Sequence, residues 1–598
     1  MADTGNIPER KDVPRHLRWQ PEDLFQDYGQ WKSQLSAAGS KLKVVAGFKH
    51  RLPESTDTLY EAVSTYEETA KTVEKVFFYA HLKKDEDNSC SQYQAMLDQA
   101  QNLLIQFEAA ASFLIPEILS LDEAFLKNAL YETRFKDYTH FLNNLLRKKA
   151  HVLSSREEEI LALSGEIAQA PRYIFSMIND ADIKFPRIED QQGNTIELTK
   201  GNFTKFMENR DRKIRKKAFN QLYGTYSKQK NTIAAALAYS VKKDLFYARI
   251  RQYGSSLDAA LFEDNIPSAV YDNLIESVHN YLPALQQYLA VKQQALKLEK
   301  MHSYDLYVPL VEDSQSDYPY QQATSIIKEC LKAMGPDYLK IINLAMGNRW
   351  IDVVETRGKT SGAYSWGCYD CHPFILLNYQ NNLDSMFTIA HELGHAVHSY
   401  LSNKNQPYIN SSYSIFLAEI ASTLNEIMLT EYLLKNNHSR EKKIYILNHY
   451  LEQFRNTVFR QTMFAEFEKT IHHMAQNQQS LTQKNLSDVY FDLNKKYYGP
   501  GLSLDEGIEM EWARIPHFYN SFYVYKYATG FCAASALAQK IRQEQGYLDR
   551  YTEFLSSGGS DYAINLLKKL GVDMTKPEPV NLALDSFARL VDQLKDLI

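Results

Sequence analysis

The chain has 598 residues, 44% hydrophobic and 23% charged, which is the composition of a folded globular protein and excludes a disordered or fibrous one. Its 67 Lys and Arg residues against 73 Asp and Glu residues give a net charge of −6, so we expect neither nucleic acid nor an anionic membrane as a partner. The five cysteines are few and odd in number, which argues against a disulfide framework.

From the N-terminus, a polar stretch leads into a long series of amphipathic segments. The first twenty residues contain no apolar signal segment, and we find no apolar run long enough to span a bilayer, so we expect a cytoplasmic protein. Apolar residues then recur three and four positions apart in Leu59–Phe78, Tyr93–Leu119, Glu157–Ile178, Lys205–Tyr247 and Ser268–Leu298. Because strands do not alternate with these segments, the pattern predicts a mainly α fold rather than a doubly wound α/β sheet.

Two segments interrupt the helical pattern. Ile183–Leu198 has alternating apolar residues on both sides of Gly193–Asn194, which predicts a β-hairpin. Trp350–Tyr379 contains several glycines and a short apolar run, which predicts strands with a glycine-containing loop. We place a domain boundary after the hairpin, giving an N-terminal helical region over 1–200 and a second region over 201–598.

The strongest chemical signal is an H-E-x-x-H pattern that starts at His391. Residues four apart lie on one face of a helix, so His391 and His395 can bind one metal ion, with Glu392 within reach of a metal-bound water. With 16 histidines in the chain, about 0.03 matches would arise by chance. The pattern therefore favours a metal site over an ordinary buried helix.

A third metal ligand is expected further along the chain. A catalytic zinc usually has three protein ligands and a position for water. Glu419 lies in the apolar segment Phe416–Glu426, where an unpaired carboxylate would be costly, so we take it as the third ligand rather than a salt-bridged surface residue. Glu426 lies on the same face and either orients a ligand histidine or is solvated. Two His and one Glu suit one Zn²⁺ per chain, with cobalt and manganese left open.

These residues resemble a known family. The sequence HELGHAVHS, followed 28 residues after His391 by EIASTLNE, resembles the thimet-oligopeptidase-like (M3) zinc metallopeptidases, and most closely their oligoendopeptidase F branch. The likeness covers nearly the whole chain, including the Gly362–Ser365 turn, Asp384 and the segment PHFYNSFYVYKYATGF. It implies a metalloendopeptidase that cuts internal bonds of short unfolded peptides, with zinc on both histidines and the downstream Glu.

The resemblance also implies an architecture and roles for other residues. The expected fold is two-lobed and helical around a deep substrate channel, with a small β element near the active site and the catalytic region in 201–598. Glu392 is expected as the general base. His517 and Tyr525 are expected to stabilise the oxyanion. Tyr523 and Tyr527, which share a helix face, stay as alternatives, and a core aromatic stripe is the other interpretation.

Substrate contacts are expected around the β element and the tyrosine segment. By resemblance, the residues that contact the peptide are Gly362, Ala363, Tyr364, Tyr523 and Tyr527. The extended run Pro373–Leu377 either pairs with the substrate backbone as an added strand or is an ordinary buried strand. Cys368 and Cys371 form a lone C-x-x-C, which we interpret as free thiols.

Two other functions stay open at this stage. A carboxypeptidase or dipeptidase of the same helical architecture would need a charged anchor for a chain end, such as Arg357 or Arg514. A non-catalytic peptide-binding protein with structural zinc is disfavoured, because such sites have four protein ligands and usually use Cys. Short peptides are the expected partners, and the sequence does not show whether the chain has partner proteins.

Overall fold

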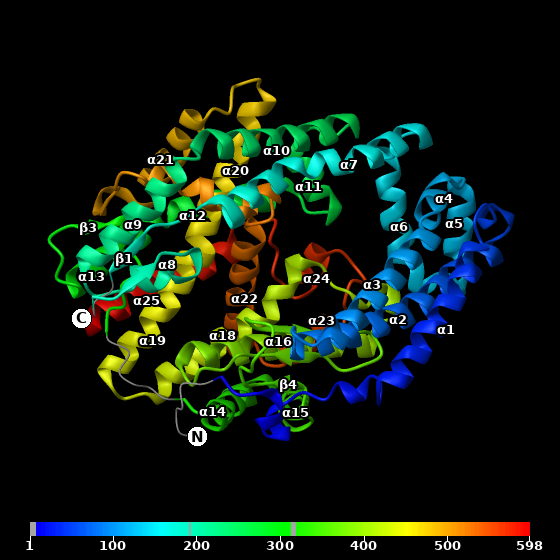
Figure 1. Ribbon diagram of the computed structural model, residues 1–598, viewed down its shortest axis with the longest axis horizontal. Coiled ribbons are helices and arrows are strands. Elements are labelled where there is room, and N and C mark those ends of the chain that lie inside the picture. The colour runs from blue at the N-terminus through cyan, green and yellow to red at the C-terminus, as the bar shows by residue number, and fades with distance from the viewer. Residues whose placement is uncertain (1–6, 190–192, 312–317) are drawn as a thin grey trace. The chain divides into compact units, whose positions relative to one another are not determined.

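The computed structural model describes residues 7–189, 193–311 and 318–598 (Figure 1). Helices make up most of the chain, and short strands form small sheets, as the sequence predicts. The chain divides into two compact units, each assembled from three segments. The first unit comprises 1–150, 316–429 and 538–570, and the second comprises 151–315, 430–537 and 571–598. The domain boundary expected near residue 200 stays a prediction.

The first unit is built on long amphipathic helices near the N-terminus. Asp27 and Ser55 accept backbone N–H groups at the starts of α1 and α2, and α1, α2 and α3 pack against one another around Trp31 and Leu82. The helices of this unit are α1 Tyr28–Ala46, α2 Thr56–Glu86, α3 Ser91–Ala111, α4 Leu114–Ser120, α5 Glu123–Tyr131, α6 Thr139–Lys148, α14 Tyr320–Leu331, α15 Pro336–Gly347, α16 Leu383–Asn405, α17 Tyr408–Ser411, α23 Tyr547–Leu555 and α24 Ala563–Lys569.

One segment of the first unit differs from our expectation that no apolar run is long enough to span a bilayer. Ser91–Ser120, which covers α3 and α4, reaches a mean hydropathy of 1.4 and by length and composition alone could cross a membrane. Met96, Leu103 and Phe107 on α3 nevertheless pack into the core beside α1 and α2. A core helix of a folded protein meets the same criteria, so this segment is weak evidence for a membrane span.

A three-stranded sheet in the first unit lies against α16. Its strands are β4 Ile351–Asp352, β5 Tyr364–Trp366 and β6 Phe374–Leu376, in the order β4-β6-β5. β6 is parallel to β4 and antiparallel to β5, and all three of its residues are buried. Because both edges of β6 are already paired, the idea that Pro373–Leu377 adds a substrate strand is wrong, and the run is an ordinary buried strand.

The second unit contains the predicted hairpin and most of the later helices. β1 Arg187–Glu189 pairs antiparallel with β2 Thr195–Glu197, and β3 Met301–His302 pairs parallel with β7 Leu502–Ser503. The helices are α7 Ser155–Ser176, α8 Lys200–Met207, α9 Arg212–Ser227, α10 Lys230–Ile250, α11 Ser256–Glu263, α12 Ser268–Asn280, α13 Leu282–Ala295, α19 Arg440–Gln453, α20 Arg460–Gln476, α21 Gln483–Tyr498 and α25 Glu578–Leu597.

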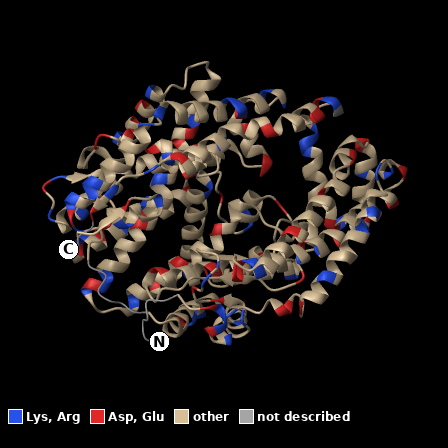
Figure 2. Ribbon diagram, viewed as in Figure 1, with Lys and Arg blue, Asp and Glu red and all other residues tan. Residues whose placement is uncertain are grey.

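Two long helices continue from one unit into the other. α18 spans Ile415–Asn436 and α22 spans Tyr525–Gln543, so each contributes residues to both units. Two π-helical turns also occur in the second unit: Met177–Asp182 extends α7, and Phe454–Phe459 joins α19 to α20. Such turns often occur at functional sites. Lys and Arg positions and Asp and Glu positions are both spread along the helices (Figure 2), in keeping with the small net charge.

Candidate metal centre and active site

Two helices, α16 and the part of α18 that lies in the first unit, bring the three predicted metal ligands together. α16 starts after Asn382, whose side chain accepts the backbone N–H of Ser385 at 2.8 Å. One turn apart on α16, His391 and His395 place their Nε2 atoms 3.1 Å from each other. Glu419 on α18 places Oε2 3.4 Å from His391 Nε2 and 3.6 Å from His395 Nε2.

These separations fit a small tetrahedral cation. Ligand atoms at about 2.0–2.1 Å from a tetrahedral zinc lie about 3.3 Å from one another, close to the three distances of 3.1, 3.4 and 3.6 Å. Two imidazoles and one carboxylate also leave a fourth position for water or substrate. Within the described ranges, this is the single group of three or more His, Cys, Asp or Glu side chains arranged to hold a metal ion.

Glu426 orients one of the ligands. Its Oε1 lies 2.9 Å from His391 Nδ1, so the Nδ1–H donates to the carboxylate and Nε2 is left to bind a metal. Burial opposes a charge on His391, but the hydrogen bond and negative charge of Glu426 raise the pKa of the metal-free imidazole to about 9. Of the two alternatives for Glu426, contact with a ligand histidine is therefore the one found in the structure.

The other two histidines of α16 are held neutral. Burial and then the neighbouring His391 charge lower the pKa of His395 to about 4, so its ring remains uncharged and able to bind a metal. His398 is buried, stacks on the Tyr413 ring at 3.6 Å, and has its pKa lowered to about 3, first by burial and then by His395. His398 thus packs beneath the site.

Glu392 lies beside the three candidate metal ligands and is almost fully buried. It is only 6% exposed, and the backbone N–H of Ser365 in β5 donates to its carboxylate. Burial raises the pKa of Glu392 to about 7, while the His391 charge acts in the opposite direction. A carboxylate whose pKa lies near neutrality is well suited to accept and return a proton.

Gly394 allows the two ligand-bearing helices to approach closely. A Cβ at this position would lie 2.6 Å from both the backbone oxygen of Ala421 and the Cα of Ser422 on α18. Asn425 on α18 fixes the same contact by donating to the backbone oxygen of Ala390 at 2.9 Å. This role was not predicted from the sequence. The signal that could have shown it is a glycine inside a helix, which costs about 1 kcal/mol relative to alanine and so needs a packing reason.

The predicted substrate loop lies in the same unit as the metal ligands. Gly362, with φ +86°, and Ala363 are exposed just before β5. The Tyr364 hydroxyl donates to Asp85 at 2.6 Å, and Asn378 donates to the backbone oxygen of Gly362 at 2.8 Å. The loop is thus anchored through the Tyr364 hydroxyl and the backbone oxygen of Gly362, while Gly362 and Ala363 are themselves exposed.

The tyrosine segment lies in the second unit. The 3-10 turn Pro516–Tyr519 carries a half-buried His517, and the Tyr527 hydroxyl lies 3.5 Å from His517 Nε2. The Tyr523 ring is 5.4 Å from the Tyr527 ring and 6.3 Å from that of His517. Tyr525 is 1% exposed, with its ring 5.1 Å from that of Tyr271. The structure therefore groups His517 with Tyr523 and Tyr527, and places Tyr525 in the core.

A buried carboxyl group on α20 supports the turn between His517 and Tyr523. The backbone N–H of Phe522, a residue with φ +59°, donates to Glu468 Oε1 at 3.0 Å. Glu468 is fully buried, and this burial, followed by the nearby Asp244 charge, raises its pKa well above the ordinary value. Asp244 also accepts the Ser521 hydroxyl at 2.6 Å. Burial therefore favours the neutral form of Glu468, whose carboxyl oxygen holds this turn in place by accepting the Phe522 N–H.

The chain is similar to known peptidases over most of its length. Residues 205–586 match the profile described as Peptidase family M3, and residues 117–185 match that of Oligopeptidase F. The chain is 44% identical to Oligopeptidase PepF of Bacillus subtilis (strain 168), over 99% of this chain and 89% of that one. It is 38% identical to the chromosomal Oligoendopeptidase F of Lactococcus lactis subsp. cremoris, over 99% of each chain.

Solved structures are similar over the same length. A putative peptidase from Chlamydophila abortus has a TM-score of 0.93 at 35% identity, covering 99% of this chain and 100% of that one. The oligoendopeptidase-F from Enterococcus faecium has a TM-score of 0.74 at 36% identity, covering 95% of this chain and 99% of that one.

Proposed function

This chain belongs to peptidase family M3, in its oligoendopeptidase F branch, and on that premise we propose that it is a zinc enzyme that hydrolyses internal bonds of short, unfolded peptides. The observation that carries the proposal is the cluster of His391, His395 and Glu419. Their donor atoms are separated by 3.1–3.6 Å, beside the buried carboxyl group of Glu392. One Zn²⁺ per chain is the ion that best suits two imidazoles and one carboxylate.

The proposed mechanism assigns one task to each side chain. When bound, Zn²⁺ supplies a Lewis acid that polarises the scissile carbonyl group and acidifies a water molecule. Glu392 accepts a proton from the attacking water and then delivers it to the leaving amine. Glu426 keeps His391 in the tautomer whose Nε2 binds the metal. His391, His395 and Glu419 would hold the ion. Because water and not a side chain is the nucleophile, no covalent acyl-enzyme forms.

Further residues are proposed to stabilise the oxyanion and to bind the peptide. Burial, and then the charge of Arg460, lower the pKa of His517, so its neutral ring can donate a hydrogen bond to the oxyanion. A tyrosine hydroxyl is the second proposed donor, and the burial of Tyr525 favours Tyr527 or Tyr523 for this role. The exposed backbone of Gly362–Ala363 is proposed to contact the peptide.

The proposed location is the cytoplasm, where short peptides from protein breakdown would be available. All five cysteines are free thiols, which suits a reducing compartment.

A Glu392→Gln variant tests the proposal. We expect it to bind one zinc per chain by elemental analysis and to lose at least about 100-fold in kcat on a short peptide, because the proton acceptor is gone. Glu441→Gln, an exposed residue at the start of α19, is the matched control and should retain activity. A Glu392→Gln enzyme that works at the normal rate would contradict the general-base role. Stoichiometric zinc in a His391→Ala variant would contradict the ligand assignment.

A further inference from the structure

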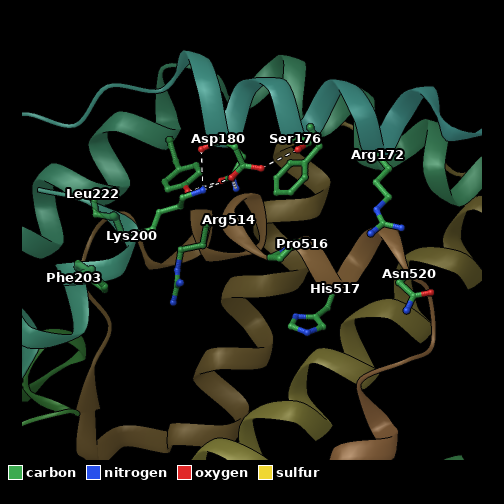
Figure 3. A pocket seen from close by; sticks show the side chains of 13 residues that line it. Arg172, Ser176, Asp180, Lys200, Phe203, Leu222, Arg514, Pro516, His517 and Asn520 are labelled. Carbon is green, nitrogen blue, oxygen red and sulfur yellow. Dashed lines mark hydrogen bonds and ion pairs between the residues drawn. The ribbon is translucent and has the colours of Figure 1, made fainter. Parts of the chain in front are cut away.

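The second unit contains a cavity of about 570 Å³ that has His517 in its wall (Figure 3). α7 and the π turn that follows it form one side, α8 and α9 contribute further residues, and the segment from Arg514 to Asn520 completes the lining. His517 is the residue of this wall that we assign to the oxyanion, so a group bound in the cavity would lie beside a residue that we propose contacts the substrate.

Positive charge dominates the lining. Arg172, Lys200 and Arg514 all line the cavity, whereas Asp180 is the single acidic residue among the described residues that do so. Lys200 pairs with Asp180 and also donates to the backbone oxygen of Asn179 at 3.1 Å. The Lys200 charge is therefore already balanced within the wall.

The charges of Arg172 and Arg514 are not each balanced by a carboxylate in this way. Arg172 is exposed and has no hydrogen-bond or ion-pair partner among the described parts of the chain. Its guanidinium points from α7 toward the segment that carries His517 and Asn520 (Figure 3). Arg514 shares one carboxylate with a second arginine, because Glu511 Oε1 lies 2.8 Å from Arg514 and 2.6 Å from Arg460. Two guanidinium groups against one carboxylate leave an excess positive charge beside the cavity.

Apolar side chains complete the wall. Phe175, Phe203 and Leu222 line the cavity together with the charged groups. A cavity of this size with apolar walls and a few convergent polar groups is typical of sites that orient an organic ligand. A planar guanidinium that lacks a partner is well suited to a carboxylate, which it can bind through two parallel N–H donors.

We propose that this cavity is a subsite for a carboxylate of the peptide substrate, and that Arg172 is its principal anchor. The carboxylate belongs either to the C-terminus of the peptide or to an Asp or Glu side chain near the cleaved bond. This inference rests on the proposed peptidase function, to which it adds a substrate preference. Arg172 acts on specificity and not on the chemical step.

The test compares peptides that differ by one charge. One pair has the same sequence with a free or an amidated C-terminus, and a second pair, both amidated, has Glu or Gln within three positions of the cut. For the wild type, we expect about a tenfold higher kcat/KM for the charged member of at least one pair, as a charge-assisted hydrogen bond provides. For Arg172→Gln, we expect that ratio to fall to about one.

A control on the same helix separates this effect from general damage. Arg156 is an exposed residue on α7 that pairs with Glu159 at 2.7 Å and does not line the cavity, so Arg156→Gln should keep the wild-type ratio. Because the readout is a ratio for one enzyme, a uniform loss of activity cancels. Arg172→Lys should restore part of the preference, since it keeps the charge but not the paired donors.

The two peptide pairs identify the source of the carboxylate. Loss of the acid-over-amide preference in Arg172→Gln assigns the cavity to the C-terminus, and loss of the Glu-over-Gln preference assigns it to a side chain. Unchanged ratios in Arg172→Gln, or a wild type without preference in either pair, would overturn this inference while the peptidase function stands. A wild type that cleaves none of the four peptides would contradict the proposed function, and this inference with it.

Discussion

Replacing Gly394 by alanine tests whether the close approach of α16 and α18 assembles the metal centre. The added Cβ would lie 2.6 Å from the Cα of Ser422, whereas carbon atoms in ordinary contact are about 3.5–4.0 Å apart. The atoms that the Cβ would meet are backbone atoms, so α18 itself must move away by roughly 1 Å. Glu419 lies on α18, and a displacement of this size exceeds the tolerance of about 0.2 Å for metal–ligand distances.

The energies of helix propensity and of overpacking together favour a net loss of stability in Gly394→Ala. Alanine gains about 1 kcal/mol over glycine in helix propensity, but overpacking against backbone costs about 1–3 kcal/mol. We therefore expect Gly394→Ala to lower the free energy of unfolding by up to about 2 kcal/mol, as measured by urea denaturation. Zinc affinity, measured by competition with a chromophoric chelator, should fall by about 10- to 100-fold, as when the support of a ligand is removed.

Gly39→Ala provides the matched control. Gly39 lies inside α1 of the same unit, and an added Cβ there meets nothing within 4 Å. This variant should gain up to about 1 kcal/mol in stability and keep its zinc affinity. If Gly394→Ala behaved like Gly39→Ala in both assays, the close approach of the two helices would not be what positions Glu419.

Three further predictions follow from single side chains. Glu426→Ala should weaken zinc binding by about 10- to 100-fold in the same competition assay. Burial raises the pKa of Glu468 in the folded protein, whereas the unfolded group ionises above about pH 4.3. The free energy of unfolding therefore falls by about 1.4 kcal/mol per unit of rising pH until the folded pKa is reached. Glu468→Gln should therefore gain in Tm relative to the wild type from pH 5 to pH 7, and parallel profiles would contradict a neutral Glu468. Tyr527→Phe should lower kcat by about 10²–10³-fold and Tyr525→Phe should not, and the reverse order would restore Tyr525 as the oxyanion donor.

The metal centre could be predicted because its ligands follow local rules. His391 and His395 are four apart on a strongly helical segment, and Glu419 is a lone carboxylate in an apolar one. What the sequence did not show depends on contacts between distant elements. The backbone N–H that Ser365 donates to Glu392, and the close approach at Gly394, exist only once β5 and α18 pack against α16.

The mainly helical fold class could be predicted from the sequence, but the order of the strands and the segments that form each unit could not. Helical periodicity and the Gly193–Asn194 hairpin were readable from the chain, but the hydrophobicity of Pro373–Leu377 does not distinguish a central strand from an edge strand. The tyrosine segment posed a similar problem. A regular helix was assumed there, but a 3-10 turn precedes α22, which begins only at Tyr525. Each unit is also built from three separate segments of the chain, and no local sequence pattern shows which segments belong together.

The most direct test of the central claim is mass spectrometry of the products from unrelated peptides of graded length and one folded protein, with and without a metal chelator. If the chain is a zinc oligoendopeptidase, we expect internal cuts in the short peptides and an intact folded protein. The cuts should disappear with chelator and return when Zn²⁺ is added. Trimming from one chain end only, or cleavage that persists with zinc removed, would contradict the account.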